Sequence, residues 1–248
     1  MQKEFKNRRI NRKEKDNKSY YMPLDIVYIL DKSGSMSGTV KTTVNGFNDY
    51  IREEQRKFKK VMNIFHKTLN DAYKQGILVD PMIPIEPTVS LVLFDNDYHY
   101  VFKDKRLLDI KRLDYEDYRP SGSTALLDTI GNVILDLDKK KSNKAIIMIT
   151  TDGYENSSLE FSRTKIKEMI KNHDNYTVVY IGADIDSYME ARSIGIKDEL
   201  IANYAKNEEC ERMKSRSLNN LTECVCFSES IDNSWKEDLD KFIEKNKD

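Results

Sequence analysis

The feature that most constrains this chain is the junction between an apolar run, Leu24–Leu30, and the polar string DKSGS that follows it. The run is apolar except at its second residue, which is typical of a parallel strand covered on both faces. Asp31, Ser33 and Ser35 would then lie at the carboxyl end of that strand, where open α/β sheets bind their ligands. Carboxylate and hydroxyl oxygens suit a hard cation such as Mg²⁺, and the string lacks the sulfur and imidazole donors that zinc and copper prefer.

Two segments further along the chain supply more oxygen donors. Thr124 ends the turn-rich loop Pro120–Thr124 and precedes an amphipathic run, so it lies at the start of a helix. Asp152 follows the second long apolar run, Ala145–Ile149. If the two apolar strands are neighbours, the three loops converge on one point at the edge of the sheet.

The chain resembles the von Willebrand factor A (vWA) family, whose metal-ion-dependent adhesion site (MIDAS) combines D-x-S-x-S with a Thr and then an Asp. The corresponding residues are Asp31, Ser33, Ser35, Thr124 and Asp152, with no substitution at any of them. The strings LDKSGSM, NGFNDYI, GSTALLD, TTDGYENSS and YIGADID are also similar to the family, and they extend from about residue 24 to about residue 195.

The resemblance implies a fold and a site. The fold would be a Rossmann-like vWA fold of the α/β class, with a doubly wound, mostly parallel sheet and one antiparallel edge strand. The alternation of strands and helices also favours this topology. The family, here in its intracellular type with an intact MIDAS, implies that the three hydroxyls bind the metal directly and that the two carboxylates bind it directly or through water.

These expectations define a function. With neutral ligands at its remaining positions, a divalent ion held by two carboxylates would still attract an anion, and Mg²⁺ readily keeps an exchangeable water position. We therefore expect a divalent-metal-dependent protein-binding module, an adhesion or scaffold domain, whose ion accepts an Asp or Glu from a partner protein. Mg²⁺ is the expected metal, with Mn²⁺ or Ca²⁺ as alternatives, and no catalytic residue is expected.

Other interpretations compete with this one. Ser33 or Ser35 could cap the following helix, and Asp152-Gly153 could form an ordinary turn. A metal-dependent phosphohydrolase could use Asp31 as its nucleophile, but such enzymes commonly carry a second Asp at the position of Ser33, and Glu155 is the only spare carboxylate nearby. Nucleotide binding is a third alternative, but the sequence contains no glycine-rich phosphate-binding motif. A structural vWA-like domain with an empty site is the fourth alternative.

Composition narrows the choice of partners and location. The net charge is −1 over 248 residues, so no global field directs the protein to nucleic acid or to a membrane surface, and we expect neither as a partner. No run is long enough to span a bilayer. The three cysteines, Cys210, Cys224 and Cys226, do not suit a disulfide framework, so we expect buried or half-buried thiols and a cytoplasmic protein.

The chain divides into three expected parts. Residues 1–20 hold eight Lys or Arg against three Asp or Glu and are predicted to form a basic, disordered arm that is not a signal peptide. Residues 21–228 would form the vWA domain, in which 58–87 is interpreted as a helical and loop insertion. Residues 229–248 hold seven Asp or Glu against four Lys and are predicted to form an acidic amphipathic helix.

Periodicity and turn residues place the remaining elements. The turn Asp95-Asn96-Asp97 separates two antiparallel strands, and its carboxylates are explained by turn chemistry. The predicted strands are 24–30, 89–94, 98–102, 144–150, 177–182 and a final edge strand at Cys224–Phe227. The predicted helices are 40–51, a continuation over 58–72, 126–137, 157–171 and 186–194.

Overall fold

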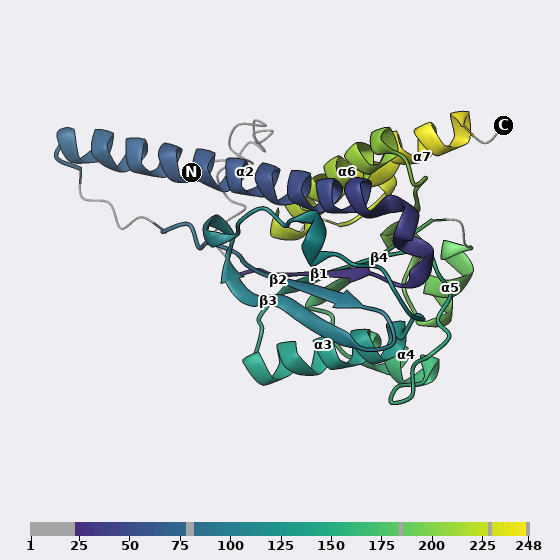
Figure 1. Cartoon of the computed structure of the whole chain (residues 1–248). Helices are drawn as coiled ribbons and strands as arrows, with labels where there is room; N and C mark the ends of the chain where they lie inside the picture. The colour runs from purple at the N-terminus through teal and green to yellow at the C-terminus, as the bar shows by residue number, and fades with distance from the viewer. Residues whose placement is uncertain (1–22, 78–81, 184–185, 228–229, 247–248) are drawn as a thin grey trace, which may run out of the picture.

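One mixed sheet organises the chain, as Figure 1 shows for the computed structural model, which describes residues 23–77, 82–183, 186–227 and 230–246. Within these residues six strands form the order β3-β2-β1-β4-β5-β6. The strands are β1 Asp25–Asp31, β2 Thr88–Phe94, β3 Tyr98–Arg106, β4 Ala145–Thr151, β5 Tyr176–Gly182 and β6 Ile201–Asn203. All neighbours are parallel except β2 and β3, which confirms the predicted doubly wound sheet with one antiparallel edge strand.

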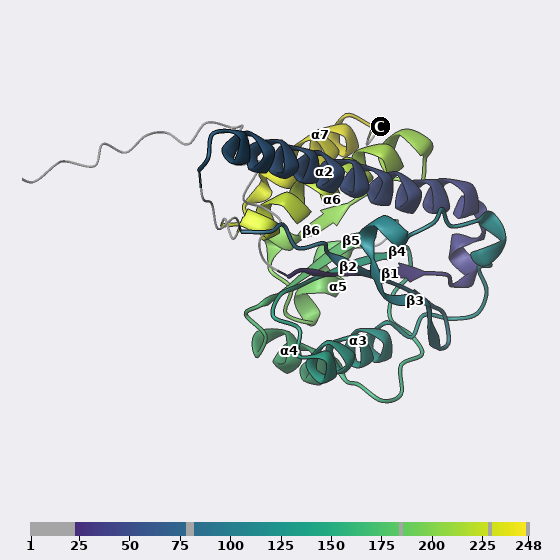
Figure 2. The ribbon, with the colours of Figure 1, turned by 90° about the vertical axis from the view of Figure 1, so that its left-hand side faces the viewer.

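Helices cover both faces of the sheet, because successive strand residues point to opposite sides. In β1, Tyr28 and Leu30 belong to one apolar core and Val27 and Ile29 to the other. Figure 2 shows α2, α6 and α7 above the sheet and α3 and α4 below it. The helices are α2 Val40–Lys74, α3 Leu126–Lys140, α4 Arg163–Lys171, α5 Ser187–Ser193, α6 Glu208–Phe227 and α7 Glu237–Lys245.

The strand order puts a topological switch point between β1 and β4. The chain leaves β1 for β2 and β3 on one side and then returns to β4 on the other side of β1. Leu30 lies in register with Thr150, so β1 and β4 end at the same edge. The chain continues from β1 to α2 on one face of the sheet and from β4 to α4 on the other face, and open α/β sheets bind their ligands at such a point.

Helix α2 is a single helix of 35 residues. It includes both the predicted helix at 40–51 and its predicted continuation over 58–72. Its first half packs against α6, where a Cβ on Gly46 would collide with the Glu211 carboxylate and the Ser215 hydroxyl donates to the Gly46 carbonyl at 2.8 Å. Its second half extends well past the sheet (Figure 1). Whether 58–87 is an insertion relative to the family stays a prediction.

The prediction of an edge strand at Cys224–Phe227 is wrong. This segment is the last turn of α6, and the edge strand is β6 instead. Leu218, Leu221 and Val225 are buried at helical spacing, but much of the remaining buried face of α6 is polar. Asn219, for example, donates to the Tyr50 carbonyl at 3.1 Å. This polar face hid the helical period, and the short alternation of Cys224-Val225-Cys226 was misleading.

The helix predicted to begin at Ser157 begins only at Arg163. The backbone before it is bound to side chains instead of forming a first turn. The Asp128 carboxylate of α3 accepts the N–H groups of Leu159, Glu160 and Phe161 at 2.7 to 2.9 Å. Ser162 then caps the helix by accepting the Lys165 N–H at 3.2 Å. Asp128 therefore fastens the long loop after β4 to α3.

The C-terminal segment docks on the domain through its apolar and basic side chains. Trp235 and Leu239 are buried, and the Trp235 indole donates to the Glu199 carbonyl at 2.7 Å. The buried Lys236 ammonium donates to the Tyr188 hydroxyl and the Asp198 carbonyl, both at 3.0 Å. Helix α7 lies within the predicted 229–248 helix, whereas the basic arm at 1–20 lies outside the described residues and the boundary at 228 stays a prediction.

The three cysteines have the environments that the sequence predicted. Cys210 is buried, Cys224 and Cys226 are partly buried, and all three are free thiols, as predicted. Among the described helices, none combines the length and the apolar character that crossing a bilayer requires.

We expect Asp128→Asn to lower the free energy of unfolding by about 1–3 kcal/mol, because three backbone amides lose a charged acceptor. Urea denaturation measures the loss. Asp71→Asn is the matched control, since that exposed α2 carboxylate has no side-chain hydrogen bond within the described residues. Equal stability of the two variants would contradict the role given to Asp128.

Candidate metal centre

Asp31, the last residue of β1, anchors a cluster of oxygen atoms at the switch point. Its side chain is buried, and Oδ1 accepts the Ser33 backbone N–H at 2.6 Å. The other oxygen, Oδ2, accepts the Thr151 hydroxyl of β4 at 2.5 Å. The carboxylate thus joins the ends of the two strands whose loops the sequence predicted to converge.

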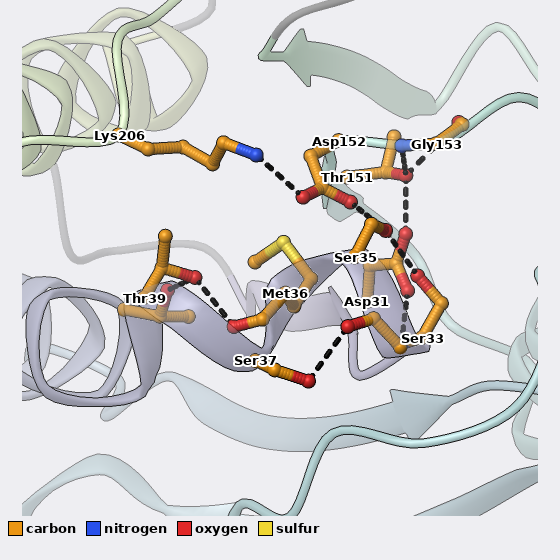
Figure 3. A network of polar contacts seen from close by, with 12 residues as sticks. Asp31, Ser33, Ser35, Met36, Ser37, Thr39, Thr151, Asp152, Gly153 and Lys206 are labelled. Carbon is orange, nitrogen blue, oxygen red and sulfur yellow. Dashed lines mark hydrogen bonds and ion pairs between the residues drawn. The ribbon is translucent and has the colours of Figure 1, made fainter.

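A chain of hydroxyls links the β1 loop to Asp152, as Figure 3 shows. The Ser33 and Ser35 hydroxyl oxygens lie 3.0 Å apart, and the Ser35 hydroxyl donates to Asp152 Oδ1 at 2.5 Å. Ser33 and Asp152 are buried, whereas Ser35 is exposed. The cluster is therefore open to solvent on the side of Ser35.

Thr124 faces the same space, as the surroundings of Gly153 show. A Cβ added to Gly153 would lie 3.0 Å from Thr124 Oγ1, 3.8 Å from Asp31 Oδ2 and 3.9 Å from Ser33 Oγ. Glycine at this position leaves that space free. The structure thus brings all five predicted site residues together, from loops after β1 and β4 and from the loop before α3.

Backbone hydrogen bonds hold these three loops to one another. Gly34 N–H donates to the Gly122 carbonyl at 3.1 Å, which ties the β1 loop to the loop before α3. Gly122 has φ +72°, a conformation that favours glycine. Thr124 and Asn156 bond reciprocally, since Thr124 N–H donates to the Asn156 side chain at 2.9 Å and Asn156 N–H donates to the Thr124 carbonyl at 3.1 Å. The donors are preorganised rather than carried on independent loops.

Lys206 also belongs to this cluster, although the sequence analysis did not identify it. Its ammonium lies 2.9 Å from Asp152 Oδ2, the carboxylate oxygen that faces away from Ser35 (Figure 3). The Asp152 side chain is 0% exposed and that of Lys206 is 24% exposed, so the pair is largely shielded from water. Lys206 lies between β6 and α6, and no local motif connects it to a site 54 residues earlier.

The electrostatics of the cluster favour an additional cation. Burial raises the pKa of the Asp31 carboxyl, hydrogen bonds from Thr151 and Ser33 oppose this shift, and the nearby Asp152 charge adds to it. Two carboxylates and one ammonium leave a net charge of −1. A divalent cation would reverse the sign to +1, and the five oxygen donors match the ligands that hard cations take.

The described residues contain no group of three or more His, Cys, Asp or Glu side chains placed to hold a metal. This result is consistent with the donor set, because three of its five side chains are hydroxyls. The chemistry of the oxygen donors therefore suits a hard divalent cation, and the set contains none of the sulfur or imidazole donors that zinc and copper prefer.

Neighbouring carboxylates have other partners. Glu155 accepts the N–H groups of Leu127, Ser157 and Ser158 at 2.8 to 3.0 Å, so it holds the loop after β4. Asp95 accepts the Asp97 N–H at 3.2 Å and forms an ion pair with Lys32. The turn interpretation of Asp95 accounts for the first contact, and the ion pair adds a link to the β1 loop.

Comparisons with known proteins identify the fold. No protein-family model matches the sequence, and the curated proteins contain no match to it. Among solved structures, three neighbours illustrate the likeness: proximal thread matrix protein 1 of the mussel byssus with a zinc-occupied MIDAS motif, the pilus adhesin SpaC of Lactobacillus rhamnosus GG, and the vWF domain of the type V pili tip protein Mfa5 of Porphyromonas gingivalis.

The mussel protein aligns with a TM-score of 0.54 at 14% identity, over 82% of this chain and 46% of its own. SpaC aligns with a TM-score of 0.58 at 15% identity, over 82% of this chain and 30% of its own. The Mfa5 domain aligns with a TM-score of 0.53 at 11% identity, over 81% of this chain and 96% of its own. The chain thus spans less than half of the first two proteins. At these identities the likeness is one of fold, and the chain has the vWA fold.

Asp31→Asn should raise the Tm of the metal-free protein by about 2–4 °C at neutral pH, because it removes a buried charge. The Thr151 hydroxyl can turn to the Gly153 carbonyl at 3.2 Å, so the amide is tolerated. Burial raises the pKa of the Asp31 carboxyl in the folded protein, so the cost of ionising it is fully present at neutral pH and is lost as the pH falls to the pKa of the unfolded chain, and the difference in Tm should therefore shrink toward pH 4. Thermal unfolding in chelator at pH 7 and pH 4 measures both effects, and a lower Tm for the variant at pH 7 would contradict them.

Proposed function

We propose that this protein is a divalent-metal-dependent protein-binding module. Asp31, Ser33, Ser35, Thr124 and Asp152 would hold a Mg²⁺ ion that accepts an Asp or Glu carboxylate from a partner protein. The observation that carries the proposal is the convergence of these oxygen donors from three cross-linked loops on one space, with only Ser35 exposed.

Each residue has a part in this function. Asp31 and Asp152 supply negative charge from the ends of β1 and β4, and the three hydroxyls supply neutral oxygens. Gly153 keeps the space between Thr124 and Asp31 free of a side chain. When bound, the ion would supply Lewis acidity and an exchangeable position for an anionic ligand. With Lys206 included, the charge of the loaded site is positive, which favours a carboxylate over a neutral ligand.

Two observations bear on the choice of metal. The mussel neighbour carries zinc at its MIDAS, which supports a divalent ion at this edge of the fold. The donors here are oxygens without sulfur or imidazole, which favours Mg²⁺, with Mn²⁺ or Ca²⁺ as alternatives. We also propose that the protein is a vWA domain of the intracellular type that acts in the cytoplasm, and its three free cysteines support this proposal.

The alternative phosphohydrolase has less support. Asp31 is buried, and both of its oxygens accept hydrogen bonds, so neither is presented as a nucleophile. Glu155, the spare carboxylate that could have served as an acid or base, accepts three backbone N–H groups instead. We therefore propose a binding protein and not an enzyme.

Ser35→Ala should weaken Mg²⁺ binding by at least about tenfold, because it removes one donor and the link between Ser33 and Asp152. Isothermal titration with Mg²⁺ and with Mn²⁺ measures the change. The matched control is Ser37→Ala, since Ser37 lies in the same short 3₁₀ helix and its exposed hydroxyl donates to the Gly34 carbonyl at 2.6 Å.

The same pair of variants tests the partner. The immobilised wild-type protein should retain partner proteins from native lysate in Mg²⁺, and chelator should release them. The Ser37→Ala variant should retain the same proteins, whereas the Ser35→Ala variant should not. The proposed function would be rejected if wild type and Ser35→Ala bound Mg²⁺ with equal affinity, or if chelator did not release the retained proteins.

A further inference from the structure

A lysine inside a metal centre has electrostatic consequences that the oxygen donors alone do not reveal. The two oxygens of Asp152 have different partners, because Oδ1 accepts the Ser35 hydroxyl and Oδ2 pairs with the Lys206 ammonium. The carboxylate thus presents one oxygen to the donor cluster and the other to a fixed positive charge. Lys206 contacts the cluster from behind Asp152, on the side away from Ser35 (Figure 3).

The backbone around Lys206 is held in place. Tyr204 is buried, and its N–H donates to the Gly182 carbonyl at 3.0 Å at the end of β5. The Ala205 N–H donates to the Sγ of the buried Cys210 at 3.1 Å, in the first turn of α6. The ammonium is therefore carried by a segment bound to both the sheet and α6, and its position beside Asp152 does not depend on a free loop.

A positive charge at this place acts oppositely on two binding steps. It repels a divalent cation that enters the donor cluster, and it neutralises half of the charge that would attract one. Once a cation is bound, the same ammonium raises the net charge of the site from zero to +1, and the bound ion attracts an incoming carboxylate more strongly. Because the pair is largely shielded from water, screening reduces these effects only in part.

We propose that Lys206 is a built-in counter-ion of the metal centre, which weakens binding of the divalent cation and strengthens binding of a carboxylate to the loaded centre. This inference rests on the proposed function, since it concerns the same donor cluster. Lys206 is thus a specificity-determining residue that lowers the affinity of the site for the metal ion and raises the affinity of the loaded site for an anionic partner.

The inference predicts that Lys206→Met tightens Mn²⁺ binding by about tenfold and weakens carboxylate binding to the Mn²⁺-loaded protein by about three- to tenfold. Electron paramagnetic resonance of free Mn²⁺ measures the first affinity. For the second, N-acetylglutamate is titrated into the loaded protein, and the loss of water-proton relaxation enhancement reports displacement of metal-bound water.

Three further variants isolate the charge. Lys206→Arg keeps it and should leave both affinities within about threefold of wild type. Lys206→Gln removes it but keeps a hydrogen-bond donor for Asp152, and it replaces the Met variant if that variant does not fold. Lys171→Met removes an exposed charge from the last turn of α4, at the opposite edge of the sheet, and should change neither affinity.

A stability measurement without metal adds an independent readout. In chelator, Lys206→Gln should have a Tm about 4–8 °C below wild type, because Asp152 loses its counter-charge, and saturating Mn²⁺ should reduce this difference.

Opposite shifts of the two affinities in the neutral variants support the inference. Unchanged affinities, or shifts in the same direction, overturn it while leaving the proposed function intact. A wild-type protein that binds no Mn²⁺ overturns both.

Discussion

The bond between the Thr151 hydroxyl and the Asp31 carboxylate is the interaction on which the site depends. It joins the carboxyl ends of β1 and β4 at the point where the strand order reverses. The Asp31 carboxylate is buried there, and hydrogen bonds from a backbone N–H and a hydroxyl, rather than an ion pair of its own, offset the free-energy cost of removing it from water. The remaining negative charge of the cluster is the property from which both the metal site and the role of Lys206 follow.

This arrangement exchanges stability for function. The loops are fixed to one another by reciprocal backbone bonds, so Asp31 and Asp152 cannot move apart to relieve their mutual repulsion. Strain of this kind is common at binding sites, where the geometry suits the bound state better than the free one. The single ammonium of Lys206 relieves part of the repulsion without filling the position between the hydroxyls.

Much of the fold and the convergence of the five oxygen donors could be predicted from sequence because their signals are local. Two apolar runs, each followed by a polar turn, located the edge where Asp31 and Asp152 meet. Lys206 could not be found in this way, since its contact with Asp152 depends on how the segment between β6 and α6 lies against the loop after β4. The end of α6 was misassigned because its buried face carries Asn219 and Thr222, which bond to Tyr50 of α2, in place of an apolar stripe.

The length of α2 has a mechanical consequence. The helix begins directly after the short 3₁₀ helix Gly34–Thr39 that contains Ser35, and its 35 residues correspond to about 52 Å of unbroken rod. A tilt of about 5° at its start would carry the far end, near Lys74, through about 4.5 Å. Because the first half of α2 packs on α6, such a tilt would involve both helices, and the projecting end of α2 would turn it into a displacement that a pair of spectroscopic labels can resolve.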